Sequence, residues 1–521
     1  MTQPTPPRLS RAARLALHRA WYEDHQYNLA EAGELYPLAE GDNWPRLRLL
    51  TARIITNRHL GLEIVQPPEF KLADEKTETW LRRALRLNGL RGAMRGAAIQ
   101  KSHAGDVGVL FAYKPSEAAV FGTPWQIGFI DPACYEVTRL HPSGVFDEVD
   151  VYAVREAVDD PDLTTTFRWS RTTYRRDAVL YWPEVEGGEH LRPGEGEFRT
   201  ACLLEHKTPR PPASPNTLGV IPFVVVQNLS DGSGWEGVSD YHLLTHQFHR
   251  LNVHVDQLEE GVILDNKLKL VFIDAEEVYT EHGAGITALQ VKSDQSGADD
   301  RQASVSAPPF GTGGGNRLEF LQLLLDSVMQ AAGVAQTGTA KELFGNEAAS
   351  SSALQAFFSL QAAVAQTKRE NWLGERPDYG LSGLVRKLLH AASRVDRKSP
   401  VYEKTAEDLF GDDFELQLDW PPMFALSAPE KQTLASVAQQ ANDDGLPPEY
   451  VAASWARVLG VTDSTAVKKI ADALRKRQEQ ADAGGLLRPT GQAAQRGILG
   501  SGQGDGLGAD GGSVTATENP E

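Results

Sequence analysis

Two segments in the middle of the chain carry apolar residues at helical spacing. The first stripe starts beyond Ser239, an expected N-cap, and repeats every three or four residues at Leu244, Phe248, Leu251, Val255, Leu258 and Val262. The second stripe is formed by Leu318, Leu321, Leu325, Val328 and Ala332. Short strand-like runs lie between them, at 267–273 and 288–292. The pattern therefore predicts a long helix, a small β insertion and a second long helix.

The N-terminal part of the chain changes from helical to alternating periodicity. Helices are predicted over 8–30, 45–57 and 73–87, with a short strand over 60–65. From residue 107 the period becomes two, which predicts a mostly antiparallel β region over 107–206. Its expected strands are 107–113, 126–130, 135–139, 149–155, 165–171 and 178–182, and a buried strand follows at 221–227.

The C-terminal part is predicted to be mainly helical. A polar loop is followed by helices and one strand, expected at 351–372, 381–395, 414–420 (strand), 429–442, 447–459 and 464–480. The last segment, 483–521, has 11 glycines in 39 residues and few large apolar side chains. Because it offers too little apolar surface to offset the entropy of ordering, we expect it to be disordered. The fold class is therefore α+β.

Composition narrows the class of protein. A chain of 521 residues is too long for one compact core. It has 52 Lys and Arg against 70 Asp and Glu, a net charge of −18, which argues against a protein that coats nucleic acid through a basic face. No apolar run approaches the length of a bilayer span, and the start of the chain lacks the features of a secretory signal. Two cysteines predict no disulfide framework and favour a reducing compartment.

The sequence contains no recognisable catalytic motif. The P-loop motif, the zinc motif His-Glu-x-x-His and Cys-x-x-Cys pairs do not occur in the sequence. We therefore predict no catalytic residue, no cofactor and no metal site.

Two clusters remain as alternatives. His242, His246 and His249 share one face of the first long helix, at a spacing that suits a zinc or nickel site. No cysteine or carboxylate stands among them, so a solvated or interface face is the favoured interpretation. Asp231, Glu236 and Asp240 lie near the start of the same helix. There they complement the helix dipole, and a role as a general acid or base is the alternative.

The order of several motifs resembles a known family. The strand segment 216–228, with Gly219 and Ile221-Pro222, leads to Gly237, Ser239 and Asp240 and then to a long helix with Leu251-Asn252. Further matching segments are 130–137, the helix 349–368, the strand 414–422 and the turn 445–447. Together they cover about 40–480 and resemble the portal, or head-to-tail connector, proteins of tailed bacteriophages, in the branch with long non-contractile tails.

The resemblance implies an elongated, ring-forming portal fold with long stem helices, a β-rich wing, a small α/β clip and a helical crown. The implied parts are an N-terminal helical arm (1–29), wing (30–238), stem helices (239–264 and 316–335), clip (265–315), tunnel loop (336–350), tunnel helix with the rest of the wing (351–427), crown (428–482) and tail (483–521). The stem helices are expected to pack through Leu244, Phe248, Leu251, Val255, Leu258, Leu318, Leu321, Leu325 and Val328.

The resemblance also implies a function in which the protein catalyses no reaction. Such a ring, usually of twelve subunits, stands at one capsid vertex and conducts double-stranded DNA without sequence specificity during packaging and ejection. Expected partners are the large subunit of the terminase motor, the major capsid or scaffolding protein and a head-completion (adaptor) protein, with no membrane partner. The protein would be found in the virion, and in the host cytoplasm during assembly. Residues expected to face DNA from the tunnel loop are Lys341, Glu342, Asn346, Glu347 and Ser350.

The acidic charge fits a channel through which DNA passes better than a protein that binds DNA tightly. Twelve subunits at −18 each give about −216, which keeps a duplex from adhering to the ring. Two other hypotheses stay open at this point: a different connector or adaptor protein of the virion, and a DNA-processing enzyme whose site carries no recognisable motif.

Overall fold

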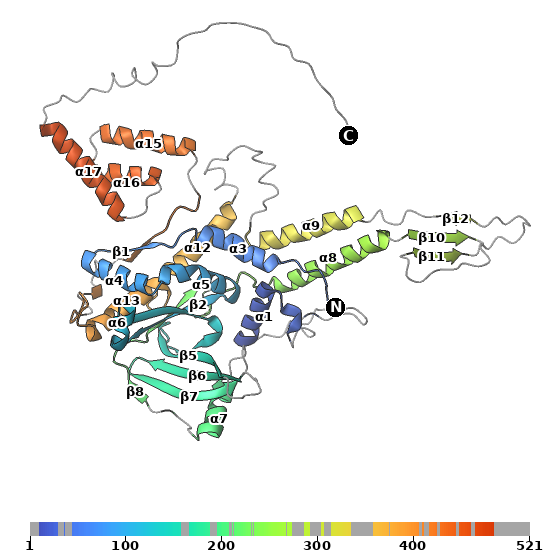
Figure 1. Cartoon of the computed structure of the whole chain (residues 1–521), viewed down its shortest axis with the longest axis horizontal. Coiled ribbons are helices and arrows are strands. Elements are labelled where there is room, and N and C mark those ends of the chain that lie inside the picture. The colour runs from blue at the N-terminus through green and yellow to red at the C-terminus, as the bar shows by residue number, and fades with distance from the viewer. Residues whose placement is uncertain are drawn as a thin grey trace, which may run out of the picture. The chain divides into compact units, whose positions relative to one another are not determined.

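The structure is a computed structural model of the whole chain, and it is α+β (Figure 1). It describes residues 10–29, 36, 44–157, 166–187, 195–207, 211, 213–230, 232, 234–266, 268–273, 286–291, 304–306, 314–334, 358–374, 376–405, 409–410, 416–424, 428–443, 447–459 and 464–483. Two units are distinguished, Met1–Glu430 and Lys431–Glu521. Within the described residues, none of the helices combines the length and the apolar character that crossing a bilayer requires.

The first unit begins with helices that pack on one another and on a sheet. They are α1 (Arg11–Glu23), η1 (Gln26–Asn28), α3 (Thr51–Glu63), α4 (Glu75–Leu87) and α5 (Leu90–Ala104), with β1 (Glu69–Leu72) between α3 and α4. The Ser10 hydroxyl caps α1 and the Asp74 carboxylate caps α4, each by accepting a backbone N–H. The expected strand at 60–65 is wrong, because α3 continues through this segment to Glu63.

A three-stranded antiparallel sheet forms the centre of this unit. Its strands β2 (Asp106–Tyr113), β3 (Trp125–Ile130) and β9 (Phe223–Gln227) lie in the order β3-β2-β9. Between β2 and β3 the chain forms η2 (Pro115–Glu117) and α6 (Ala118–Phe121). Apolar side chains of β2 and β9 pack against α5 and α13 (Gly380–Val395), and together they form the largest core of the described chain.

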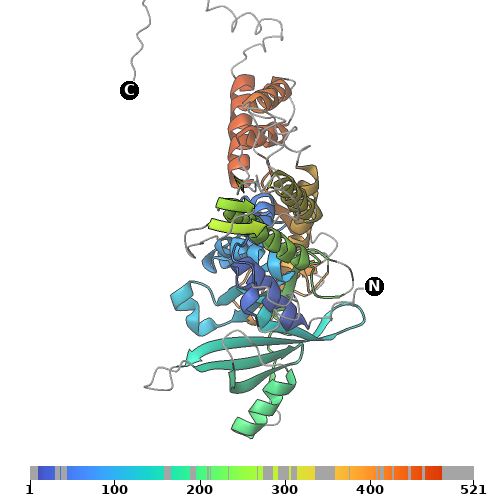
Figure 2. The ribbon, with the colours of Figure 1, turned by 90° about the vertical axis from the view of Figure 1, so that its right-hand side faces the viewer.

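A second antiparallel sheet contains the remaining strands of the predicted β region. The short helix η3 (Pro132–Cys134) leads into β4 (Tyr135–Leu140), which is followed by β5 (Phe146–Ala157), β6 (Thr166–Arg175), β7 (Ala178–Gly187) and β8 (Ala213–Pro215) in consecutive order. The helix α7 (Glu195–His206) packs against β7 on one face of this sheet (Figure 2). Alternation thus located these strands to within a few residues, except that β5 to β7 are longer than expected.

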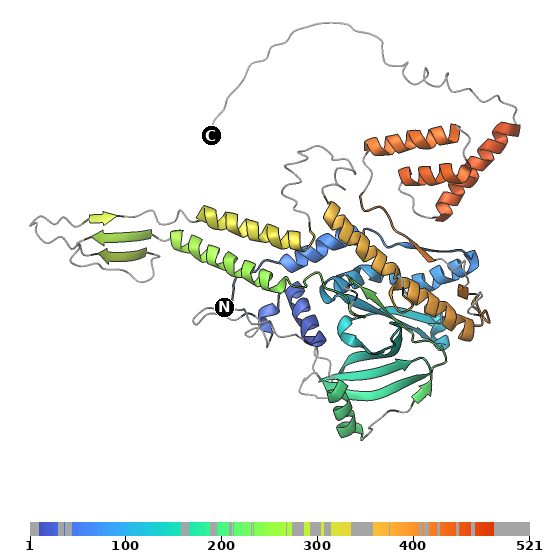
Figure 3. The same ribbon diagram turned by 180° about the vertical axis from the view of Figure 1, so that it is seen from behind.

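The two striped segments form a pair of helices with a small sheet between them in the chain. The helices are α8 (Thr245–Asn266) and α9 (Gly314–Ala331), and the sheet contains β10 (Leu268–Ile273), β11 (Ile286–Val291) and β12 (Ser304–Ser306) in the order β11-β10-β12. β10 is parallel to β11 and antiparallel to β12. Figure 3 shows the two helices side by side, with the sheet beyond their ends.

The bounds of these helices correct the expected ones. The first helix was expected from Ser239, but α8 begins at Thr245 and ends at Asn266. The second was expected over 316–335 and is observed over Gly314–Ala331. The helix expected from residue 351 is described as α12 (Ser359–Leu373), and β13 (Leu416–Asp419) pairs with β1 in antiparallel register.

The second unit is helical in its described part. The helix α15 (Ala428–Asp443) leads into it, and α16 (Pro448–Leu459) packs against α17 (Ser464–Ala483). Small apolar side chains fill its interior, namely Ala438, Val451, Ala452, Ala456 and Ala471. The tail beyond residue 483, for which disorder was expected, lies outside the described residues.

Candidate functional site: the helix pair and its anchor

One end of the α8/α9 pair, the end that contains Phe248 and Val328, lies in an aromatic and aliphatic core. We call this end the base of the pair. Phe248 and Leu251 of α8 and Val328 of α9 are each at most 2% exposed. They pack with Trp21 and Tyr27 from the N-terminal segment, so this segment closes the core around the base of the pair. Burial of several large side chains, each contributing roughly 1.5–3 kcal/mol, fixes the base of both helices.

The remaining residues of the predicted stem stripe lie in different surroundings. Leu244 is buried, Leu321 and Leu325 are partly buried against the same core, and Val255 and Leu258 are half-buried. Leu318 is 56% exposed. Two further apolar side chains of α9 are also exposed, Phe320 at 47% and Leu323 at 67%. A helix with apolar residues on all sides normally has neighbours on all sides. The first half of α9 therefore presents apolar side chains that are only partly covered within the described chain.

The segment that leads into α8 is held by a buried carboxylate. Asp240 Oδ2 accepts hydrogen bonds from Lys368 Nζ at 2.6 Å and Ser102 Oγ at 2.5 Å, and Oδ1 accepts one from Asn228 Nδ2 at 2.8 Å. Burial alone would raise the pKa of Asp240, but Lys368, the nearby His59 and these hydrogen bonds lower it below its usual range. The carboxylate is thus ionised, and its hydrogen-bond donors come from α5, α12 and the residues after β9.

A second buried ion pair lies beside the first. Lys101 Nζ of α5 is 2.7 Å from Glu63 Oε1 at the end of α3, and both side chains are at most 1% exposed. Trp372 Nε1 donates to the same carboxylate at 2.6 Å. Burial lowers the pKa of Lys101, while Glu63 raises it. We call Glu63, Lys101, Asp240 and Lys368 the buried anchor.

The short turn after Asp240 has an unusual backbone. The Ser239 hydroxyl accepts from Tyr241 N–H and donates to the Ser102 carbonyl, so it serves this turn rather than the helix. Leu243 follows in the left-handed region, with φ of 63° and a side chain that is 77% exposed. A leucine in this conformation costs on the order of 1–2 kcal/mol. This turn explains why α8 begins six residues later than expected.

Of the three histidines assigned to one helix face, only His249 is packed, and His242 lies in the turn before α8. His249 Nδ1 lies 3.0 Å from Tyr27 Oη, and its ring contacts Tyr36 and Trp44. Burial lowers the pKa of His249 to about 4. His242 and His246 are exposed. Over the described residues, no group of three or more His, Cys, Asp or Glu side chains is arranged to hold a metal ion.

The acidic cluster expected near the start of α8 is not brought together. Glu236 forms an ion pair with Arg14 of α1, Asp240 belongs to the buried anchor, and Asp231 lies outside the described residues. Since α8 begins at Thr245, Glu236 and Asp240 lie outside its first turn, and each is held by a different cation.

The predicted tunnel loop, 336–350, is not among the described residues. Lys341, Glu342, Asn346, Glu347 and Ser350 all lie outside the described residues.

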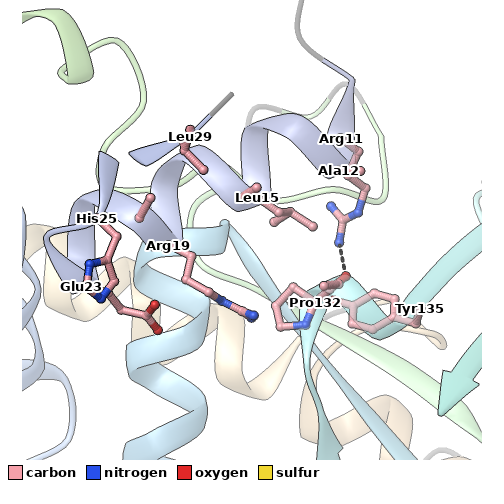
Figure 4. A pocket seen from close by; sticks show the side chains of 12 residues that line it. Arg11, Ala12, Leu15, Arg19, Glu23, His25, Leu29, Pro132 and Tyr135 are labelled. Carbon is pink, nitrogen blue, oxygen red and sulfur yellow. Dashed lines mark hydrogen bonds between the residues drawn. The ribbon is translucent and has the colours of Figure 1, made fainter. Parts of the chain in front are cut away.

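The docking of α1 is a feature that the sequence pattern did not reveal. Arg11 binds the buried Asp106 carboxylate through both terminal nitrogens, at 2.9 and 2.7 Å, and Arg19 contacts Asp131 at 2.5 Å. A cavity of about 270 Å³ lies between α1 and the η3–β4 segment. Figure 4 shows its lining side chains, with Arg11 reaching toward Pro132. Most of its wall is apolar and both arginines are ion-paired, so we assign it a role in seating α1.

No family model matches the sequence, and no curated protein matches it.

Proposed function

We propose that the chain is the subunit of a portal ring of a tailed bacteriophage, a conduit and valve for double-stranded DNA at one capsid vertex. The observation that carries the proposal is the α8/α9 pair, with a small sheet between its helices and its base rooted in an α+β body. This order of elements is what a stem, a clip and a wing require. The motif order from residue 216 to 252 supports the same conclusion.

The geometry suits a mechanical role. The buried anchor and the aromatic core hold the base of the helix pair, so the pair can bear load without unfolding the body. The exposed apolar side chains of α9 suit contact with a neighbouring subunit, and a repeated head-to-tail contact closes into a ring when the rotation divides a full turn.

In this role the protein supplies no energy for packaging. The terminase large subunit would drive DNA through the ring, and a head-completion protein would dock after packaging. The capsid or scaffolding protein would hold the ring at the vertex. The net charge of −18 per subunit keeps a passing duplex from adhering.

Electron microscopy of the purified full-length chain tests the proposal most directly. The expected result is a ring of roughly twelve subunits with an axial opening. A monomer or a small compact oligomer under all conditions of salt and concentration would contradict it. DNA cleavage by the purified protein would instead support the enzyme hypothesis.

A further inference from the structure

A second cavity, remote from the helix pair, carries an excess of positive charge. It has a volume of about 560 Å³ and lies between α4, the end of β2, the η2–α6 segment and the residues that follow α13. Arg83 lines it from α4, and Arg397 and Lys398 line it from the segment after α13. All three side chains are exposed, and none has an ion-pair partner among the residues that the structure describes. The chain as a whole has a net charge of −18.

The carboxylate in this cavity does not cancel its charge. Asp396 is 4% exposed, and its Oδ2 accepts a hydrogen bond from Trp125 Nε1 at 2.9 Å. Its Oδ1 accepts the Lys398 backbone N–H at 3.1 Å. With three cations and one carboxylate, the lining has a net charge of +2. At the margin, Glu117 already forms an ion pair with Lys114 and accepts a hydrogen bond from Gln126.

The walls of the cavity are aromatic and its border is apolar. Trp80 and Tyr113 line it, half-buried, and both rings contact Trp125. Beside it are three exposed apolar side chains, Leu87, Val120 and Phe121, which are 39%, 79% and 51% exposed. Leu87 approaches Gly122 of the lining, and Val120 and Phe121 immediately precede Gly122. A cationic hollow thus adjoins an apolar border.

We propose that this surface binds an acidic peptide segment of a partner protein, one in which carboxylates alternate with apolar side chains. The three cations would pair with the carboxylates, and Leu87, Val120 and Phe121 would cover the apolar side chains. The volume lies in the range of pockets that enclose a small ligand or a few side chains. Phosphate groups of nucleic acid would satisfy the cations but leave the apolar border exposed, so a peptide is the better match.

Fluorescence anisotropy with the full-length protein tests the proposal. The probe is a short fluorescein-labelled peptide of glutamates interrupted by leucine and phenylalanine. The Arg83→Glu/Arg397→Glu variant should raise the Kd of this peptide at least about tenfold, since two attractions become repulsions. The matched control is Arg95→Glu/Lys469→Glu, which makes the same charge change at exposed cations outside the cavity. Its Kd should stay within about twofold of the unaltered protein.

A second variant separates a peptide from phosphate-bearing ligands. Val120→Ser/Phe121→Ser should weaken the peptide severalfold while leaving any binding of tripolyphosphate or oligothymidylate unchanged. The proposal is overturned if the peptide does not bind, if the two charge variants lose affinity equally, or if oligothymidylate displaces the probe better than unlabelled peptide does. None of these outcomes depends on whether the chain forms a ring.

Discussion

The helix pair α8/α9 is packed very differently at its two ends. At the base, Phe248, Leu251 and Val328 are almost fully buried, and the buried anchor holds the turn that leads into α8. At the start of α9, Leu318 and Leu323 are more than half exposed. Both ends have the same apolar periodicity in the sequence. The difference shows that one end is complete within a single chain, whereas the other has apolar surface that another surface can cover.

Removing one charge of the buried anchor should have the largest effect on the base. Lys368→Met leaves the Asp240 carboxylate buried without its main cation, and we expect a loss of about 3–5 kcal/mol in the free energy of unfolding. Urea denaturation followed by circular dichroism measures it.

The double variant Lys368→Met/Asp240→Asn is the control. It removes both charges and should be less destabilised than the single variant, because no buried ion is left without a partner. Equal losses in the two variants would mean that the ion pair itself does not hold the turn.

Acid should weaken the base through three buried histidines, each by less than the loss of one anchor charge. Burial lowers the pKa of His59 and of His103 to about 4, and that of His18 to about 3. Unfolding returns each to about 6.5, so the unfolded chain binds more protons below that pH, and stability falls as the pH drops from about 6.5 toward 4. At pH 5 each histidine should contribute a loss of roughly 2 kcal/mol.

Urea denaturation at pH 7 and pH 5 measures this dependence. His103→Phe keeps a ring in the stack with Tyr22 and removes the titrating group, so it should reduce the difference between the two pH values. An unchanged difference would show that His103 does not titrate on unfolding.

A change at the exposed end should have the smallest effect on stability. Leu323→Asp is expected to alter the free energy of unfolding by less than about 0.5 kcal/mol, because Leu323 is 67% exposed. In the proposed ring this charge would be trapped between subunits, so light scattering after size exclusion should nevertheless show a smaller assembly than the unaltered chain forms.

Val328→Asp on the same helix provides the contrast. Val328 is 2% exposed, so a carboxylate there should unfold the base or destabilise it by several kcal/mol. If Leu323→Asp left the assembly intact, the exposed end of α9 would not be a subunit contact.

Periodicity was sufficient to predict the helix pair and most strands, but not their anchoring. Leu244, Phe248 and Leu251 repeat at helical spacing, and β2 to β7 alternate, so both were visible in the sequence. The helix α5 was missed because glycine and alanine make up much of it, and small side chains give a weak pattern.

The partners of Asp240 could not be predicted for another reason. Asp240 and Lys368 are 128 residues apart, and each has the appearance of a surface charge when only its neighbours in sequence are considered. The Ser239 hydroxyl similarly had an expected role as a helix cap, yet it is used by the turn through its contact with Ser102.

The buried anchor also dictates when the chain can fold. Asp240 leaves the ribosome before its partner Lys368, and at about 5–20 residues per second the 128 residues between them take roughly 6–26 s. Glu63 is separated by a still longer stretch, 309 residues, from Trp372, which donates a hydrogen bond to it. Because a buried carboxylate without its partner is costly, the body cannot close around the base of α8 until α12 has been made. The helix pair is therefore synthesised before Lys368, the residue that completes the anchor.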